Sequence, residues 1–215
     1  MSEPKTTSGN FFEDFRLGQH IVHATPRTVT HGDVALYTGL YGSRFAVQSA
    51  DPFATAIGYP RSPVDDMLVF HVIFGKTVPD ISLNAVANLG YADCRFLAPV
   101  YPGDTLSADS EVIGLKENSN RETGVVYVRS SGRNQRGETV LSYVRWVMVR
   151  KRTKDAAVPA TEVPALPSRV EPSLLGQAVP SLKYSVWDNA RSGSRFRWGD
   201  YAAGERIDHV DGMTI

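Results

Sequence analysis

The titratable residues with the most unusual surroundings are Asp65, Asp66 and His71, which lie at the start and in the middle of the most hydrophobic stretch of the chain. Carboxylates and imidazoles can transfer protons near neutral pH, so general acid–base chemistry is the reaction type to consider first. The stretch, residues 65–76, predicts a buried helix that begins at the two acidic residues and ends near Lys76, where each charge suits the helix dipole. His71 lies six residues after Asp65 and projects roughly to the opposite side of such a helix, so the two are not expected to form a dyad.

Each of these residues also has a simpler structural interpretation. Asp65 is the best candidate for a proton acceptor, but a carboxylate at a helix start is commonly only a cap. His71 is the second catalytic candidate, yet a lone histidine among valine, phenylalanine and isoleucine is commonly a hydrogen-bonded core residue. Asp33 and Asp51 are interpreted as residues of helix starts rather than as catalytic groups.

Composition excludes several classes of function. Lysine plus arginine and aspartate plus glutamate both number 23 among 215 residues, so no overall field favours nucleic acid or an anionic membrane, although a local basic cluster could bind a small polyanion. Cys94 is the single cysteine and is interpreted as a small core residue, which leaves no internal disulfide.

No secretion signal begins the chain and no apolar run approaches the ~20 residues of a membrane span, so a cytoplasmic protein is expected. His20 and His23 would lie on opposite faces of a strand, and no metal site is expected.

The elements that must position these residues indicate an α+β protein with a long antiparallel sheet. A short strand at residues 20–24 should end at Pro26, and two helices should follow at residues 30–41 and 51–57. Extended segments come after the buried helix, at residues 84–98, 105–116, 123–134 and 139–151. The last has apolar residues at both alternating sets of positions, which predicts a strand inside the sheet.

Four regions are predicted along the chain: a disordered N-terminus at residues 1–10, a domain at 11–151, a proline-rich linker at 152–183 and the start of a second domain at 184–215. The second domain is inferred from a repeat in which residues 14–23 match residues 200–209 at a constant offset. Because Ile215 would then fall where the first domain has Val29, we expect the sequence to be truncated early in the second domain.

Residues 96–106, FLAPVYPGDTL, resemble the strand and turn signature of the MaoC-like hydratases. The order of elements supports this resemblance from about Phe12 to Lys151, and within that group the sequence is most similar to the N-terminal portion of the mesaconyl-CoA (2-methylfumaryl-CoA) hydratase family. The resemblance implies a hot-dog fold, in which the sheet wraps a central helix, and two such units in one chain. It implies a hydro-lyase that interconverts mesaconyl-CoA and beta-methylmalyl-CoA without metal or redox cofactor, with CoA present only as part of the substrate.

The sequence departs from the family motif where the catalytic pair would lie. The motif Gly-Asp-x-Asn-Pro-x-His corresponds to residues 42–48, so that Ser43 replaces the aspartate and Gln48 replaces the histidine. Asp66 replaces a glycine that gives a thioester close access to the helix start. By analogy with other double hot-dog hydratases, we expect the first unit to hold the ligand and the second to supply the acid–base pair, which would leave this chain alone inactive.

The resemblance also suggests which residues would bind the substrate. The backbone N–H groups of Met67 and Leu68 are expected to polarise the thioester carbonyl, and Tyr101 could line a thioester tunnel. A group of basic residues near the strand ends could bind the phosphates of CoA, although solvated strand ends would explain them equally well: Arg129, Arg145, Arg150, Lys151 and Arg152. Trp146 is interpreted as a core residue.

Two other functions remain open at this point. A non-catalytic acyl-CoA-binding or dimerisation module is consistent with the replaced motif residues, and a thioesterase on the same fold is a weaker alternative. The expected partners are an acyl-CoA and either a second hot-dog unit in the same chain or a homodimer, with no nucleic acid and no membrane. Since an unpaired sheet edge favours association, this chain alone is expected to self-associate.

Overall fold

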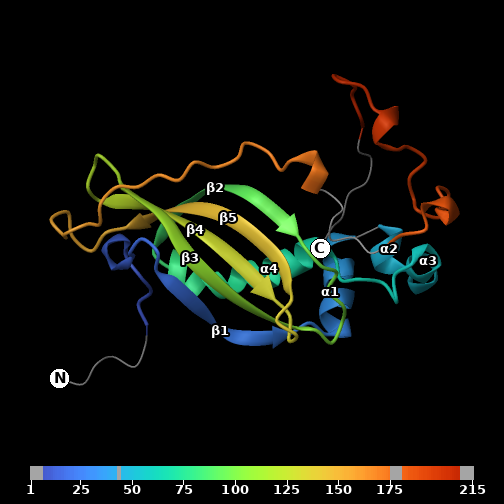
Figure 1. The fold of residues 1–215 in the computed structure, drawn as a ribbon, viewed down its shortest axis with the longest axis horizontal. Coiled ribbons are helices and arrows are strands. Elements are labelled where there is room, and N and C mark those ends of the chain that lie inside the picture. Colours follow the sequence, from blue (N-terminus) through green and yellow to red (C-terminus); the bar gives the residue numbers. More distant parts are fainter. Residues whose placement is uncertain (1–6, 43–44, 175–180, 209–215) are drawn as a thin grey trace.

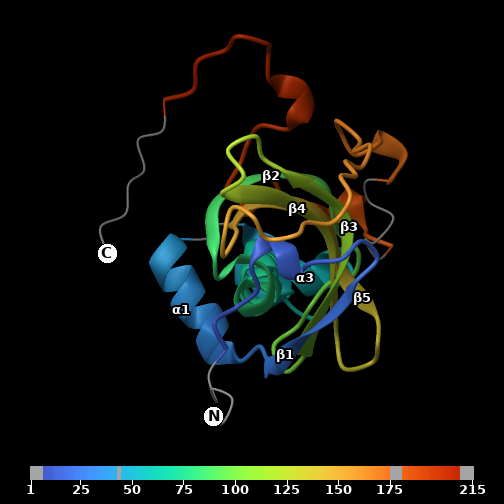
Figure 2. The same cartoon turned by 90° about the vertical axis from the view of Figure 1, so that its left-hand side faces the viewer.

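The computed structural model describes residues 7–42, 45–174 and 181–208. Its five antiparallel strands are β1 (His20–Thr28), β2 (Ala85–Phe96), β3 (Thr105–Glu117), β4 (Thr123–Arg133) and β5 (Thr139–Arg150), in the spatial order β1-β3-β4-β5-β2. The sheet curls around the helix α4 (Asp66–Thr77), as the end-on view in Figure 2 shows. The expected α+β hot-dog arrangement is confirmed, and so is the position of β5 inside the sheet, between β4 and β2.

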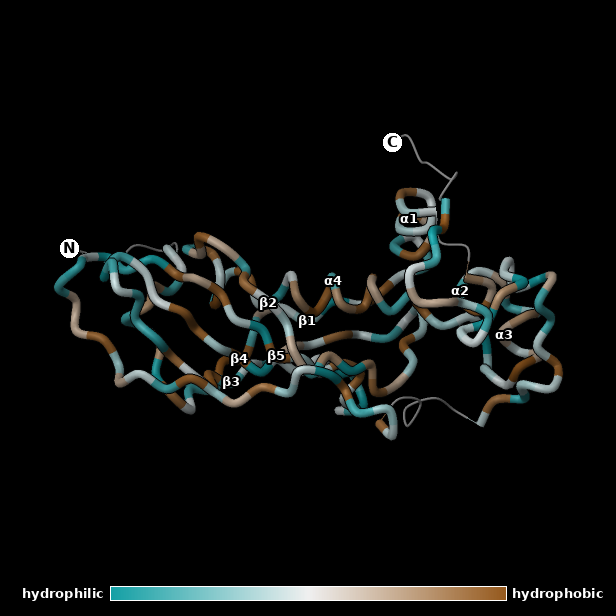
Figure 3. Tube along the Cα trace, turned by 90° about the horizontal axis from the view of Figure 1, so that it is seen from above, coloured by the Kyte–Doolittle hydropathy of each residue, from teal (hydrophilic) through white to brown (hydrophobic). Residues whose placement is uncertain are grey.

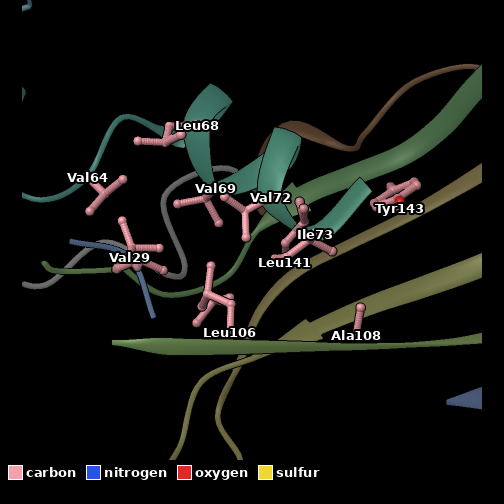
Figure 4. Packing of buried hydrophobic residues seen from close by; sticks show 12 residues of the cluster. Val29, Val64, Leu68, Val69, Val72, Ile73, Leu106, Ala108, Leu141 and Tyr143 are labelled. Atoms are coloured by element: carbon pink, nitrogen blue, oxygen red, sulfur yellow. The ribbon is translucent and has the colours of Figure 1, made fainter. Parts of the chain in front are cut away.

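The core lies between one face of α4 and the concave side of the sheet. Val69, Val72 and Ile73 point from the helix toward residues of the strands, among them Leu106 and Leu141, and Leu68 belongs to the same cluster on the side of Val64 (Figure 4). Close approach is possible because β4 has a glycine opposite the helix: a Cβ atom added to Gly132 would lie 2.1 Å from Ile73 Cδ1. The hydrophobic effect of burying these side chains fixes α4 against the sheet.

The other face of α4 is open, which corrects the expectation that this helix is buried all round. Met67 is 48% exposed and His71 is exposed, so His71 is not the core histidine that its apolar neighbours suggested. The sheet can cover only one side of the helix. On the open side α1 (His31–Tyr41), which contributes no fully buried residue, lies beside α4 (Figure 3).

Strand β1 and the helices near the family motif differ in part from the prediction. The strand continues past Pro26 to Thr28, with a register break between His23 and Arg27; proline is tolerated because β1 is an edge strand. Helices α1 and α3 (Asp51–Ile57) form as expected, and both are followed by a glycine in the left-handed conformation. The sequence did not indicate the short helix α2 (Ala46–Ser49).

The segments before and after the sheet contact it directly. Asn10, the last residue of the segment predicted to be disordered, donates a side-chain hydrogen bond to the Asp80 carbonyl at 2.7 Å, and residues 1–6 of that segment lie outside the described residues. Residues 152–174 of the predicted linker run along the outer side of the sheet (Figure 1), where Glu162 exchanges two backbone hydrogen bonds with Leu115 of β3. This part of the segment therefore packs on the sheet, while residues 175–180 lie outside the described residues.

The predicted repeat recurs as local structure. In the first copy the Phe11 amide donates to the Asp14 carboxylate at 2.9 Å, and in the second the Arg197 amide donates to the Asp200 carboxylate at 2.7 Å. The next turn recurs as well, since the Arg16 and Ala202 amides each donate to the side chain three residues later, Gln19 and Glu205. Residues 184–208 contain 3₁₀ turns and no strand, and the positions predicted beyond residue 208 lie outside the described residues.

In the described part of the chain, none of the helices combines the length and the apolar character needed to cross a membrane.

Candidate ligand-binding site

A pocket of about 130 Å³ lies at the N-terminal end of α4. Gln48 from α2 and Asp66 from α4 face it together, and apolar side chains supply most of the remaining wall, among them Phe45, Val47, Tyr59 and Phe96. The family motif position and the helix-start position, which the sequence marked separately, are thus parts of one site. Ser43, the other motif position, lies outside the described residues.

Packing and backbone hydrogen bonds hold the elements around this pocket. Val47 packs with Ala54 and Ile57 in a small core shared by α2 and α3, which fixes the side of α2 that carries Gln48. The loop before α4 is tied to the turn after β2 by a hydrogen bond of 2.7 Å from the Val64 amide to the Val100 carbonyl. The pocket therefore has a preformed frame.

Asp66 is the titratable group of the pocket. Burial by the surrounding walls, and then the negative charge of Asp65, raise the pKa of Asp66 to about 6, although its side chain still reaches solvent at the mouth of the pocket. Burial and then the charge of Asp66 raise the pKa of Tyr59. The sequence marked Asp66 only as an obstruction to the thioester, whereas a carboxyl group with this pKa can hold and release a proton near neutral pH.

Asp65 does not line this pocket. Its carboxylate accepts a hydrogen bond of 2.8 Å from the Met67 amide and so caps α4, which is the simpler role considered for it. Because the Met67 N–H is already bound, it is not the free carbonyl-polarising donor that was expected. The Leu68 N–H lies in the first helical turn, where helix geometry leaves it without an intrahelical acceptor, while the Leu68 side chain belongs to the core.

His71 lies away from the pocket, beside two tyrosines of α1. The His71 ring centre is 5.9 Å from that of Tyr37 and 6.5 Å from that of Tyr41. Burial, and then the charge of Asp65, raise the pKa of Tyr37. Tyr37 is therefore near both His71 and the charge of Asp65.

Arg145 does not lie at a sheet end, which corrects its expected role in phosphate binding. Its side chain is fully buried, donates to Thr77 Oγ1 at 2.9 Å and to Ser82 Oγ at 3.3 Å, and lies 4.5 Å from the centre of the Phe74 ring. Within the described part of the chain its Nε and Nη1 atoms have no hydrogen-bond acceptor. Arg145 therefore supports the C-terminal end of α4 from inside the fold.

Three of the other four basic residues of that group form separate contacts, and Arg150 is exposed at the end of β5. Arg129 pairs with Asp93 at 3.1 Å, buried Lys151 with Glu117 at 2.6 Å and Arg152 with Asp14 at 2.7 Å. The Arg61 guanidinium lies over the ring of Tyr101, 5.5 Å from the ring centre. Tyr101 does not line the pocket of Asp66. A phosphate site at the strand ends is therefore not assembled among the described residues.

A buried polar chain that the sequence did not reveal crosses β1 and β3. His23 Nδ1 lies 2.7 Å from Asp80 Oδ2, and His23 Nε2 lies 2.8 Å from Ser110 Oγ. These residue types could form a hydrolytic triad, but Ser110 is fully buried and also hydrogen-bonds Ser130, so a thioester has no access to its hydroxyl group. Among residues 7–42, 45–174 and 181–208, no three histidine, cysteine or acidic side chains converge in a way that could hold a metal ion.

Comparison with known proteins agrees with the fold. The family model described as mesaconyl-CoA hydratase matches residues 3–166. The chain is 62% identical over 212 residues to a beta-methylmalyl-CoA dehydratase of Chloroflexus aurantiacus and 60% identical over 212 residues to a mesaconyl-CoA hydratase of Cereibacter sphaeroides, in each case covering 98% of this chain. It spans about 60% of the length of these curated relatives, 60% and 61% respectively.

A solved structure with a similar sequence also has the same fold. A MaoC domain protein of Chloroflexus aurantiacus superposes with a TM-score of 0.93 at 60% sequence identity, covering 99% of this chain and 60% of the other. Because the family model covers most of the chain and the fold agrees throughout, the chain belongs to the mesaconyl-CoA hydratase family.

Proposed function

We propose that this chain is the first hot-dog unit of a hydro-lyase that interconverts mesaconyl-CoA and beta-methylmalyl-CoA, and that this unit holds the CoA thioester. The observation that carries the proposal is the pocket at the start of α4, where Asp66 and Gln48 meet in a chain 62% identical to a beta-methylmalyl-CoA dehydratase. A small, mostly apolar pocket with two polar groups suits the acyl end of such a ligand.

The chemistry of the reaction places catalysis elsewhere. When water adds to an enoyl thioester, its oxygen bonds to the carbon β to the carbonyl, a proton goes to the α carbon, and negative charge develops on the thioester oxygen. Asp66 is largely ionised above its pKa of about 6 and would repel that charge; a single carboxylate could still accept a proton, but the Gln48 amide beside it cannot act as the second member of an acid–base pair. The acid–base pair would therefore come from a second hot-dog unit.

The proposed place of that second unit is the open side of the sheet and of α4. Val86, Leu89 and Tyr91 of the edge strand β2 are 51%, 42% and 42% exposed, and the Tyr91 ring lies 5.7 Å from that of Phe70 in α4. Pairing at β2 would bury these side chains and satisfy the free edge of the strand. The same surface could accept a second copy of this chain when no second unit is attached.

This arrangement is tested by the association of the 215-residue chain in solution. Sedimentation velocity should show concentration-dependent association that V86K and L89K reduce, since a lysine on a strand edge opposes pairing. The matched control is V22K, because Val22 is 75% exposed on β1, the opposite edge strand. A wild-type chain that stays monomeric at all concentrations, or a V22K effect equal to that of V86K, would count against pairing at β2.

The reaction is tested by comparing two forms of the protein with mesaconyl-CoA. A form as long as the curated relatives should consume the enoyl thioester and produce beta-methylmalyl-CoA, followed by chromatography of the CoA esters. The 215-residue chain should bind mesaconyl-CoA in calorimetry without turning it over. Full turnover by the 215-residue chain would overturn our placement of catalysis, and binding without turnover by both forms would favour a non-catalytic binding module.

A further inference from the structure

The segment that follows the linker forms a second, larger pocket next to the one that Asp66 lines. Its volume is about 380 Å³, and its walls include Tyr184, Trp187, Asn189, Phe196 and Arg197. Phe45 lines both pockets, so the two adjoin at this side chain. A ligand that passes Phe45 would have one end beside Asp66 and the remainder against residues 184–197.

This segment is attached to the helices that carry the first pocket. The Lys183 amide donates to the Ile57 carbonyl at 2.8 Å, and the Trp187 ring packs edge-on against Phe53 with 5.0 Å between ring centres. Trp187 also packs against the small core shared by α2 and α3. In Figure 1 the segment lies beside α2 and α3 at one end of the molecule. The two pockets therefore share one structural support.

The volumes of the two pockets indicate which part of a ligand each could hold. Sites for small molecules of ordinary size occupy about 300–1,000 Å³, so the pocket of Asp66, about 130 Å³, is large enough only for one small end of a ligand. The neighbouring pocket, about 380 Å³, falls within that range. A small acyl group joined to a long arm fits this pair of volumes better than a compact ligand.

The chemistry of the larger pocket suits an arm that alternates apolar groups, amides and phosphates. Aromatic rings supply the walls, and Arg197 donates to the Asn189 side chain at 3.0 Å, which places a cation and an amide together. Residues 181–197 carry four basic residues, Lys183, Arg191, Arg195 and Arg197, against the single acid Asp188, whereas the whole chain has no net charge. This local excess of positive charge suits phosphate groups.

We propose that residues 184–197 bind the pantetheine and phosphate arm of a CoA thioester whose acyl end enters the pocket of Asp66. The proposal rests on the proposed function for the identity of the ligand, and it adds the segment after the linker to the binding site of the first unit. In this proposal the ligand passes Phe45, which lines both pockets, packs its arm against Trp187 and places a phosphate at Arg197.

A competing route for the arm exists on the other side of Gln48. There a pocket of about 370 Å³ is lined by His31, Asp51 and Arg61 among other residues. Arg61 is the basic residue of that route, as Arg197 is of the proposed one. Variants of the two arginines therefore discriminate between the routes.

The experiment is calorimetric titration of the 215-residue chain with CoA itself, which has the arm but no acyl group. R197Q should weaken CoA binding about tenfold, the size expected when one charge-assisted hydrogen bond is lost, and W187A should weaken it further. R206Q and W198A are the matched controls and should bind CoA as the wild type does, because Arg206 is exposed outside the pocket and Trp198 is 93% exposed.

Three outcomes would overturn the proposal: unchanged CoA affinity in R197Q, loss of affinity in R61Q alone, or no CoA binding by the wild-type chain. W187A could release the segment from α2 and α3, so the conclusion depends on R197Q, whose side chain is exposed. Because CoA lacks the acyl group, these results are independent of whether mesaconyl-CoA is the substrate. Failure of the proposed reaction would instead appear in the turnover experiment on the longer protein.

Discussion

Asp65 and Asp66 are neighbours in the chain but serve different parts of the structure. Asp65 accepts the Met67 amide hydrogen bond at 2.8 Å and caps α4, whereas Asp66 faces the pocket that Gln48 lines. Burial and the neighbouring charge of Asp65 raise the pKa of Asp66 to about 6. Substitutions at the two positions should therefore affect different measurements.

For Asp66 the expected effect is on the pH dependence of stability. The pKa of the carboxyl rises from its ordinary 3.8 to about 6, so the folded protein retains a proton that the unfolded chain has released. The stabilisation from this proton is present below about pH 4 and is lost as the pH rises to about 6. D66N, which cannot ionise, should therefore gain stability relative to the wild type between about pH 4 and pH 7.

Urea unfolding of both proteins across this range measures the effect. The comparison must be a difference between the two proteins, because Asp14, Asp33 and Asp104 have lowered pKa values and change stability in the opposite direction. Parallel stability curves for D66N and the wild type would contradict the raised pKa.

For Asp65 the expected effect is the loss of a helix cap. D65A should lower the free energy of unfolding by about 1 kcal/mol, whereas D65S should retain most of it because a serine hydroxyl can also accept the Met67 amide. Thermal unfolding measures both variants. In a protein as long as the curated relatives, D65S should also retain hydratase turnover, and an inactive but stable D65S would show that the carboxylate itself takes part in the reaction.

Arg145 is expected to contribute to the stability of the fold mainly by filling space beneath α4. R145A removes a fully buried side chain and should cost about 3 kcal/mol of unfolding free energy. R145M keeps much of the volume and removes a buried charge, so it should cost no more than about 1 kcal/mol. Equal losses in chemical denaturation would indicate that the hydrogen bonds to Thr77 and Ser82, rather than packing, dominate its contribution.

Two glycine substitutions test the close packing of α4 against the sheet. In G132A the new methyl group would meet Ile73 at 2.1 Å, and we expect a loss of about 1–3 kcal/mol from overpacking. In G75A the position in α4 is open, with nothing within 4 Å, and alanine should gain up to about 1 kcal/mol through helix propensity. Calorimetric melting of both variants gives the comparison, and a stabilised G132A would mean that α4 does not lie as close to β4 as described.

Local sequence patterns predicted most of the fold. Strand β3 was expected at residues 105–116 and spans Thr105–Glu117, and α1 begins after Thr30 and ends at Gly42 as its capping residues indicate. These boundaries depend on caps, turns and alternation, which act over a few residues. They could therefore be predicted without knowledge of the tertiary structure.

The features that were missed depend on how distant elements meet. The direction of the Arg145 side chain could not be predicted, because β5 is apolar on both faces and its alternation does not distinguish inside from outside. The exposure of His71 depends on the sheet covering only one side of α4. Asp66 and Gln48 were each identified in the sequence, but their common pocket and the raised pKa arise only when α2 and α4 are brought together.

The repeated turn at Asp14 and Asp200 shows what this short motif requires in order to form. In the first copy it is anchored by Phe12 and Phe15, both fully buried, whereas in the second the corresponding Trp198 and Tyr201 are 93% and 50% exposed. The carboxylate hydrogen bond is present in both copies. The motif is therefore encoded by short-range contacts alone, so during synthesis on the ribosome it can be in place before any strand that it precedes has emerged.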